Sequence, residues 1–145
     1  MTTPFNVGHD AQVTVVDGPT GAVITTFPPT TMFDFKPTTK RLMSEPVNGK
    51  PIYREVPQGW EGTLEYDRYD GAIDDYFATW EANYWNGASY LAGSITQTVQ
   101  EQTGAISQYQ YQGVAMKLDT AGTYKAADKV PVKITWCAST RVKVL

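Results

Sequence analysis

Cysteine and histidine are almost absent from this sequence, which contains one of each, Cys137 and His9, in 145 residues. One cysteine cannot form a disulfide within the chain, and these two residues cannot supply the ligand set of a typical zinc site. A single histidine near the N-terminus leaves no Ser-His-Asp or Cys-His arrangement unless that end of the chain folds back. We therefore expect no metal, no cofactor and no catalytic centre of these kinds.

Long apolar runs are also missing. No window approaches the roughly 18 consecutive apolar residues of a membrane-spanning helix, and the N-terminal MTTPFNVGHD lacks the basic and apolar regions of a signal peptide. The formal net charge of −3 disfavours the broad basic surface with which nucleic-acid-binding proteins contact phosphates. These absences predict a soluble chain that is not exported by a signal peptide and contacts no membrane.

Carboxylate pairs remain as a catalytic possibility, and Asp74 and Asp75 are adjacent. Neighbouring residues of a helix point about 100° apart, so the two side chains do not face a common substrate. Negative charge near the start of a helix complements the helix dipole, which gives both residues a structural role. We predict that the chain is not an enzyme.

Residues 59–87 contain the one convincing helix of the sequence. Asp70 is a favourable N-cap, and Asn86 and Gly87 provide a stop, so we predict a helix over residues 71–85. Apolar residues recur at spacings of three and four, and they are Ile73, Tyr76, Phe77, Trp80 and Tyr84. Such a stripe needs a cover, and we expect Ile73, Phe77 and Trp80 to anchor the helix to a β-sheet.

The rest of the sequence reads as strands and turns. Residues 130–138 alternate most clearly, with Cys137 on the face opposite to Ile134 and Trp136. The other expected strands are residues 11–16, 22–27, 32–37, 63–66, 90–100, 106–118 and 141–145. One helix and about seven or eight strands predict a mainly β (α+β) fold in a single domain, 1–145. We expect a β-sandwich or a partly closed β-barrel with one flanking helix.

Residues 38–58 consist of two arms about Asn48-Gly49, which is a strong hairpin-turn signal. Pro46 and Pro51 disfavour regular strand pairing, so the prediction is an extended hairpin loop. The segment is basic and has more apolar residues than a free loop requires. We expect another surface to cover it, with a flexible surface hairpin as the alternative.

The next hairpin is nearly uncharged, because Glu101 is the only charge between Asn83 and Met116. A neutral hairpin offers little defence against pairing with other strands. We expect it to contact another subunit or to line a shared lumen, through Ser94, Thr96, Thr98, Gln100, Gln108, Gln110 and Gln112. The alternative is a sheet that is buried on both faces within the monomer.

Charges are unevenly distributed along the chain. Seven acids and only Arg68 lie between Glu61 and Glu81, whereas six Lys or Arg residues and two Asp residues follow from Lys117 onward. This asymmetry indicates two complementary faces for head-to-tail association. An ordinary solvated surface is the alternative.

The segment GWEGTLEYDR, at residues 59–68, precedes the acidic, aromatic helix AIDDYFATWEANYW. Together they resemble the major tail tube proteins of contractile-tailed bacteriophages. The similarity continues through the two strands after the helix to the C-terminal ASTR, and it covers about residues 36–145. This motif is structural and carries no catalytic chemistry.

The resemblance implies a phage tail protein that self-assembles in the host cytoplasm into hexameric rings, which stack as the tube inside a contractile sheath. It implies as partners further copies of the chain, the sheath protein, the tape-measure protein and the proteins that initiate and terminate the tube. DNA passes through such a tube without specific binding. The family loop that corresponds to residues 38–58 reaches a neighbouring subunit, which implies inter-subunit contacts by Lys40, Arg41, Met43, Val47, Lys50, Ile52, Tyr53 and Arg54.

Three other functions remain open. A tailocin or a type VI secretion system uses a related tube that conducts no genome. A monomeric β-sandwich module would bind sugar or peptide through exposed aromatics. Three of the four tryptophans lie where the helix and its flanks are expected to pack, which favours a core role instead. An enzyme would have to show turnover without the usual nucleophile or metal arrangements.

Overall fold

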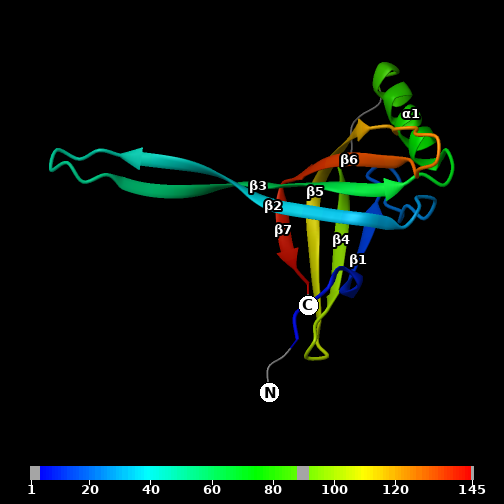
Figure 1. The fold of residues 1–145 in the computed structure, drawn as a ribbon. Coiled ribbons are helices and arrows are strands. Elements are labelled where there is room, and N and C mark those ends of the chain that lie inside the picture. Colours follow the sequence, from blue (N-terminus) through cyan, green and yellow to red (C-terminus); the bar gives the residue numbers. More distant parts are fainter. Residues whose placement is uncertain (1–3, 88–91, 145) are drawn as a thin grey trace.

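The computed structural model describes residues 4–87 and 92–144 of the chain. Its elements are η1 (Gly8–Asp10), β1 (Ala11–Val16), β2 (Thr30–Ser44), β3 (Ile52–Asp67), α1 (Ala72–Trp85), β4 (Gly93–Gln100), β5 (Ile106–Thr120), β6 (Pro131–Ala138) and β7 (Thr140–Lys143). Figure 1 shows α1 beside a body of strands, from which the hairpin of β2 and β3 projects.

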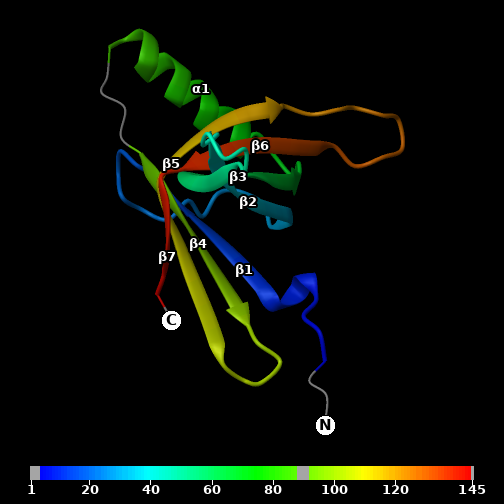
Figure 2. The same ribbon diagram turned by 90° about the vertical axis from the view of Figure 1, so that its left-hand side faces the viewer.

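The strands form two antiparallel sheets that share β5 (Figure 2). The first sheet has the order β1-β4-β5-β7, and the second has the order β5-β6-β3-β2. Neither edge of this arrangement pairs with the other within the described residues, so the sheet is not closed into a barrel. The predicted mainly β fold with one helix is confirmed, in its β-sandwich form.

The chain passes from one sheet to the other at Gly113 in β5. β5 pairs with β4 up to Val114 and with β6 from Ala115 onward, and a register irregularity lies at Gly93 and Ser94 opposite the bend. Gly113 has a φ of 67°, and a Cβ atom there would lie 2.6 Å from the side-chain oxygen of Ser139. Glycine therefore permits the bend, because other residues rarely adopt this φ.

Aromatic rings fill the space between the two sheets. Trp136 of β6 is fully buried; its ring stacks on Phe33 with centroids 5.6 Å apart and meets the Tyr111 ring edge-on at 4.9 Å. The alternation expected for residues 130–138 is confirmed, because Val132, Ile134, Trp136 and Ala138 are buried while Cys137 is exposed. Burial raises the pKa of the Tyr111 hydroxyl to about 12, although nearby Arg141 acts in the opposite direction.

Alkaline pH should destabilise this core. In the unfolded chain Tyr111 ionises near its ordinary pKa of about 10, whereas the folded chain holds the proton until about pH 12. The stabilisation is therefore complete below pH 10 and is lost as the pH rises through the folded pKa. Urea unfolding measured from pH 9 to 12 should show this decline. Tyr111→Phe should make the decline shallower, and an unchanged slope would contradict this role.

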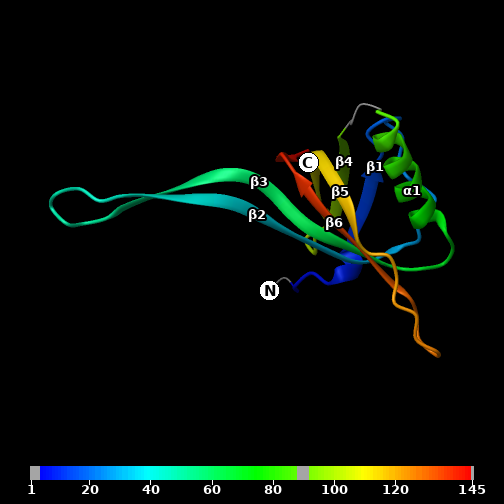
Figure 3. The ribbon, with the colours of Figure 1, turned by 90° about the horizontal axis from the view of Figure 1, so that it is seen from above.

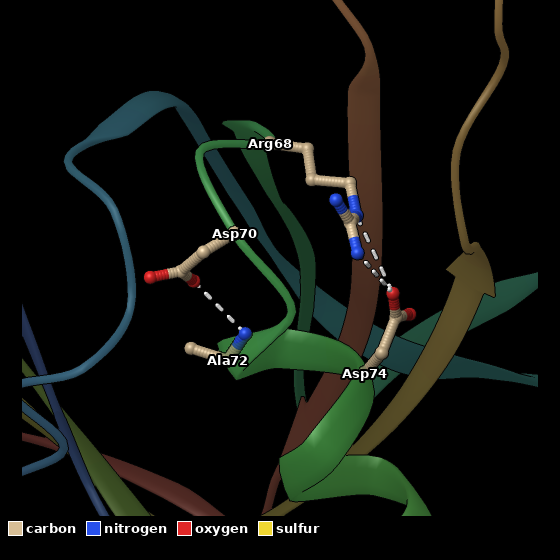
Figure 4. Close-up of polar contacts among 4 residues, drawn as sticks. All are labelled: Arg68, Asp70, Ala72 and Asp74. Carbon is tan, nitrogen blue, oxygen red and sulfur yellow. Dashed lines mark hydrogen bonds and ion pairs between the residues drawn. The ribbon is translucent and has the colours of Figure 1, made fainter.

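The predicted helix start and end are close to those observed. α1 runs from Ala72 to Trp85, and Gly87 follows with a φ of 76°, as expected for the C-terminal stop. The N-cap position is Gly71 rather than Asp70, but the Asp70 carboxylate accepts a hydrogen bond of 2.9 Å from the Ala72 backbone N–H (Figure 4). An acidic side chain therefore satisfies one of the free N–H groups at the helix start.

Arg68 holds the helix entry by an ion pair with the helix itself. Its guanidinium pairs with Asp74 at 3.3 Å (Figure 4), whereas Asp67 pairs with Lys129 at 3.6 Å.

Only the first half of the helix stripe is covered. Ile73 and Phe77 are buried, and the Tyr76 hydroxyl donates a hydrogen bond of 3.0 Å to Asp17. Trp80, which was expected in the helix–sheet core, is 40% exposed in the single chain. That expectation is wrong because the helix extends past the sandwich after its second turn (Figures 1 and 2).

The segment at residues 22–27 is not a strand. Val23 forms one isolated bridge with Val16, and Phe27 then turns inward, where its ring meets Tyr66 and Tyr76 edge-on at 5.7 and 5.5 Å. Phe27 is half-buried in this packing, and residues 22–27 add only the single bridge to β1. The expected start of a strand at Tyr90 and Leu91 lies outside the described residues, and β4 begins at Gly93.

Candidate assembly surfaces

The hairpin of β2 and β3 forms a long projecting arm, defined here as residues 38–58 (Figures 1 and 3). Its ladder continues to the pair Ser44 and Ile52, so the expectation of poor pairing is wrong. Pro46 and Pro51 lie in the turn beyond that pair, where they remove no ladder hydrogen bond. At about 3.3 Å per residue, the seven residues from 38 to 44 give the paired part of the arm a reach of about 23 Å.

The two faces of the arm differ in charge. Arg41 and Glu55 lie opposite each other on one face, and the Arg41 Nε atom is 2.7 Å from a Glu55 carboxylate oxygen. Hydrogen bonds from Arg41 and Thr39 lower the pKa of Glu55. The other face carries Lys40 and Arg54, which form no ion pair in residues 4–87 and 92–144.

The arm is apolar as well as basic. Its exposed large hydrophobic residues are Leu42, Met43, Val47, Ile52 and Tyr53. All the residues expected to make inter-subunit contacts lie on the arm, and each of them is exposed in the single chain. Nothing in the described chain covers these apolar side chains.

Trp60 and Gly62 lie where the arm joins the body. A Cβ atom at Gly62 would overlap the carbonyl oxygen of Asp34 and approach the Trp136 ring to 2.8 Å. Gly62 thus allows β2 and the core tryptophan to approach β3 closely at the base of the arm. Trp60 packs against Phe35 with ring centroids 6.4 Å apart.

The neutral residues expected to act together share one face of the first sheet. Ser94 lies opposite Gln112, Thr96 opposite Gln110, and Thr98 opposite Gln108, and Gln100 follows at the strand end. The opposite face of the same strands carries the buried Ile95, Gln97 and Tyr111. The six paired residues therefore form a polar outer surface rather than a sheet buried on both faces.

Sequence reasoning missed that β1 and β7 extend this surface. Gln12 and Thr14 of β1 lie opposite Thr98 and Thr96, and Thr140 and Val142 of β7 lie opposite Gln112 and Gln110. We define the neutral face as the outer residues of β1, β4, β7 and the part of β5 before Gly113; within the described chain these include no Asp, Glu, Lys or Arg. The alternation of residues 11–16 contained a signal for β1, but the strand order did not follow from the sequence.

Arg141 is a second residue that sequence reasoning missed. Its guanidinium lies 3.8 Å from the centre of the Tyr109 ring and 4.7 Å from that of Trp60, with Phe35 and Tyr111 close by. The Nε atom is buried and has no hydrogen-bond partner. Arg141 therefore links the first sheet to the second by cation–π contacts, inside the sandwich and away from the neutral face.

Chemical sites are not evident in the described residues. Across residues 4–87 and 92–144, no cluster of three or more His, Cys, Asp or Glu residues is arranged to hold a metal ion. Among the same residues, no helix is both long enough and apolar enough to span a membrane.

No protein-family model and no curated protein matches the sequence. Several solved structures nevertheless match the fold. A chain of the sheath/tube terminator of the extracellular contractile injection system PVC has a TM-score of 0.65 at 12% identity, covering 98% of this chain and 97% of that one. A chain of the anti-feeding prophage tube-terminating cap has a TM-score of 0.63 at 12% identity, covering 99% and 93%.

The tail tube of SPP1 also matches, with a TM-score of 0.60 at 14% identity over 94% of this chain and 77% of that one. The chain has a phage-type tail tube fold. The surfaces that the described chain leaves uncovered include the neutral face and the arm.

Proposed function

We propose that this chain is a structural subunit that self-assembles into rings, which stack as the inner tube of a contractile phage tail. The neutral face carries this proposal. On a free monomer, an uncharged face with open strand edges favours aggregation, because charged residues are a common protection against edge pairing. As the lining of a bore, the same face lets DNA pass. A surface without Lys or Arg does not displace the counterions of the phosphates, so it does not hold the DNA.

The first sheet supports ring closure by its strand directions. Its four strands alternate in direction, with β1 at one edge and β7 at the other. In a ring of identically oriented copies, β7 of one copy therefore runs antiparallel to β1 of the next. Pairing at every junction covers the β7 edge and the part of the β1 edge before Val15, where Ile24 does not already bond to β1. It removes free edges as closure of a barrel does. We propose six copies per ring, in line with the tail tube resemblance.

Blocking the β7 edge tests this closure. The Val144 N–H donates a hydrogen bond to the backbone carbonyl of Gln108 in β5. Along an antiparallel strand, residues that bond to the neighbouring strand alternate with residues that do not. The Lys143 N–H therefore points away from β5, toward the free edge. Lys143→Pro removes that donor while keeping the β5 ladder. We expect the concentration at which assemblies sediment to rise at least tenfold for Lys143→Pro.

Lys143→Ala is the matched control, because it removes the same charge but keeps the backbone N–H. It should assemble as the wild type does. Equal assembly by Lys143→Pro and the wild type would contradict pairing at this edge.

The arm and the outer surface define the proposed partners. The arm contacts neighbouring subunits, the sheath protein surrounds the tube, and the tape-measure protein occupies the bore during assembly. Initiator and terminator proteins contact the two ends of the tube. In this proposal the chain is assembled in the host cytoplasm and resides in the tail of the virion.

A tube of a contractile injection system is the second candidate function. The matched structures favour it, because two come from the PVC system and the anti-feeding prophage, at TM-scores of 0.65 and 0.63. Such a tube would share the rings and arms but would conduct no genome. Nucleic acid inside native particles distinguishes the two, since only a phage tail delivers DNA.

Electron microscopy over a concentration series tests assembly itself. We expect rings or hollow tubes above a threshold concentration. A monomeric ligand-binding module would instead give uniform small particles at every concentration, and its tryptophan fluorescence would shift when a sugar or peptide binds.

A further inference from the structure

The second half of α1 is exposed around its whole circumference. We call residues 78–86 the helix end, and every one of them is exposed, including Tyr84 at 64% and Trp85 at 75%. The rings of Trp80 and Tyr84 stack with centroids 6.4 Å apart, and the Trp85 ring meets Tyr84 edge-on at 5.1 Å. An ordered aromatic cluster on a surface is typical of protein–protein contacts.

An acidic residue lies within this cluster. Glu81 is one residue from Trp80, and Tyr84 and Trp85 follow it at the three- and four-residue spacings that make helix neighbours. None of the ion pairs in the described part of the chain involves Glu81, and the last turn of α1 has no basic residue. The helix end therefore suits a partner surface that combines aliphatic side chains with a cation.

The arm has such a surface on one side. The register places Leu42 directly opposite Arg54, and it places Lys40 and Ile52 on the same face of the ladder. We call these four residues the basic arm face. Leu42 and Ile52 are 44% and 63% exposed, so aliphatic area is available beside the two cations. On the reverse face, Glu55 already neutralises Arg41.

One chain cannot bring these two surfaces together. The arm projects from one side of the sandwich and α1 lies at the other (Figures 1 and 3). A contact between them therefore joins two copies head to tail, which leaves a free arm and a free helix end for the next copies. Contacts of this kind generate rings or filaments rather than closed dimers.

We propose that the basic arm face docks on the helix end of an adjacent copy, with Arg54 pairing with Glu81 between the aromatic rings. Leu42 and Ile52 cover Tyr84 and Trp85 in this contact, and the guanidinium lies against the rings, as arginine does in cation–π contacts. This inference rests on the proposed function, and it identifies the surface that receives the arm.

A charge exchange tests the contact. Arg54→Glu and Glu81→Arg should each raise the concentration at which assemblies sediment at least tenfold, because each places like charges together. The double variant restores the opposite charges in exchanged positions, and it should assemble within about threefold of the wild type. All of these positions are exposed, so thermal unfolding of the monomer should stay unchanged.

Lys50→Glu combined with Glu81→Arg is the matched control. It makes the same change of charge on the arm, but Lys50 lies in the turn rather than on the basic arm face. It should not restore assembly. Restoration by this control as well would show a general charge effect and would overturn the specific contact.

Disulfide trapping gives a second, independent readout. In a Cys137→Ser background, Ile52→Cys with Tyr84→Cys should form disulfides between chains, whereas Ile52→Cys with Val142→Cys on the neutral face should not. If the wild type forms tubes but neither rescue nor trapping occurs, the docking inference is wrong and the tube function stands. If the wild type never assembles, the proposed function fails, and trapping alone decides whether the arm binds the helix end.

Discussion

Replacing residues 42–54 by an Asn-Gly turn is expected to give a folded chain that does not assemble at any practical concentration. The replacement keeps Arg41 opposite Glu55, so the shortened ladder can close with a two-residue turn. It removes the exposed apolar residues Leu42, Met43, Val47, Ile52 and Tyr53 together with Lys50 and Arg54. Sedimentation velocity and electron microscopy measure the loss of assembly.

The stability of the shortened chain provides the control. Loop length affects folding free energy only weakly, by about 0.6 kcal/mol for each doubling, and the removed residues contribute nothing to the core. The free energy of unfolding should therefore stay within about 1 kcal/mol of the wild type. Tubes formed by this variant would show that the arm is not an assembly element.

The second large effect is expected in the core, where Trp136→Ala should cost about 3–5 kcal/mol in the free energy of unfolding. Trp136 is fully buried, stacks on Phe33 and meets Tyr111, so its removal leaves a cavity between the two sheets. Domains are commonly stable by only about 5–15 kcal/mol, so this loss would remove a large part of the total folding free energy. Urea unfolding followed by circular dichroism measures the change.

Trp85→Ala is the matched control for the loss of a tryptophan. Its side chain is 75% exposed at the helix end, so the free energy of unfolding should change by about 0.5 kcal/mol or less. Assembly should weaken instead, since Trp85 belongs to the proposed docking surface. Equal destabilisation by both substitutions would contradict the observed division between core and surface.

The helix and the clearest strand could be predicted because their signals are local. The three- and four-residue spacing and Gly87 defined α1, and strict alternation defined β6 around Trp136. The apolar stripe of α1 could not reveal where burial occurs. Ile73 is buried in the monomer, whereas Trp80 is exposed. Hydrophobic periodicity could not distinguish them, because it is the same for a core and for an interface between copies.

Register and strand order could not be predicted because they depend on contacts that are distant in sequence. Pro46 and Pro51 argued against pairing in the arm, yet both lie in its turn, where a ladder donor is not needed. The neutral residues of β4 and β5 were identified from composition. Their extension to Gln12 and Val142 required the pairing of β1 and β7 with those strands.

The most direct measurement is a cryo-electron microscopy reconstruction of the particles that the purified chain forms above its assembly threshold. We expect a hollow tube in which β1, β4, β5 and β7 lie innermost, with Thr96 and Gln110 facing the bore and each arm contacting another copy. Particles that stay monomeric at every concentration would contradict the proposed tube. So would a tube in which the neutral face points outward.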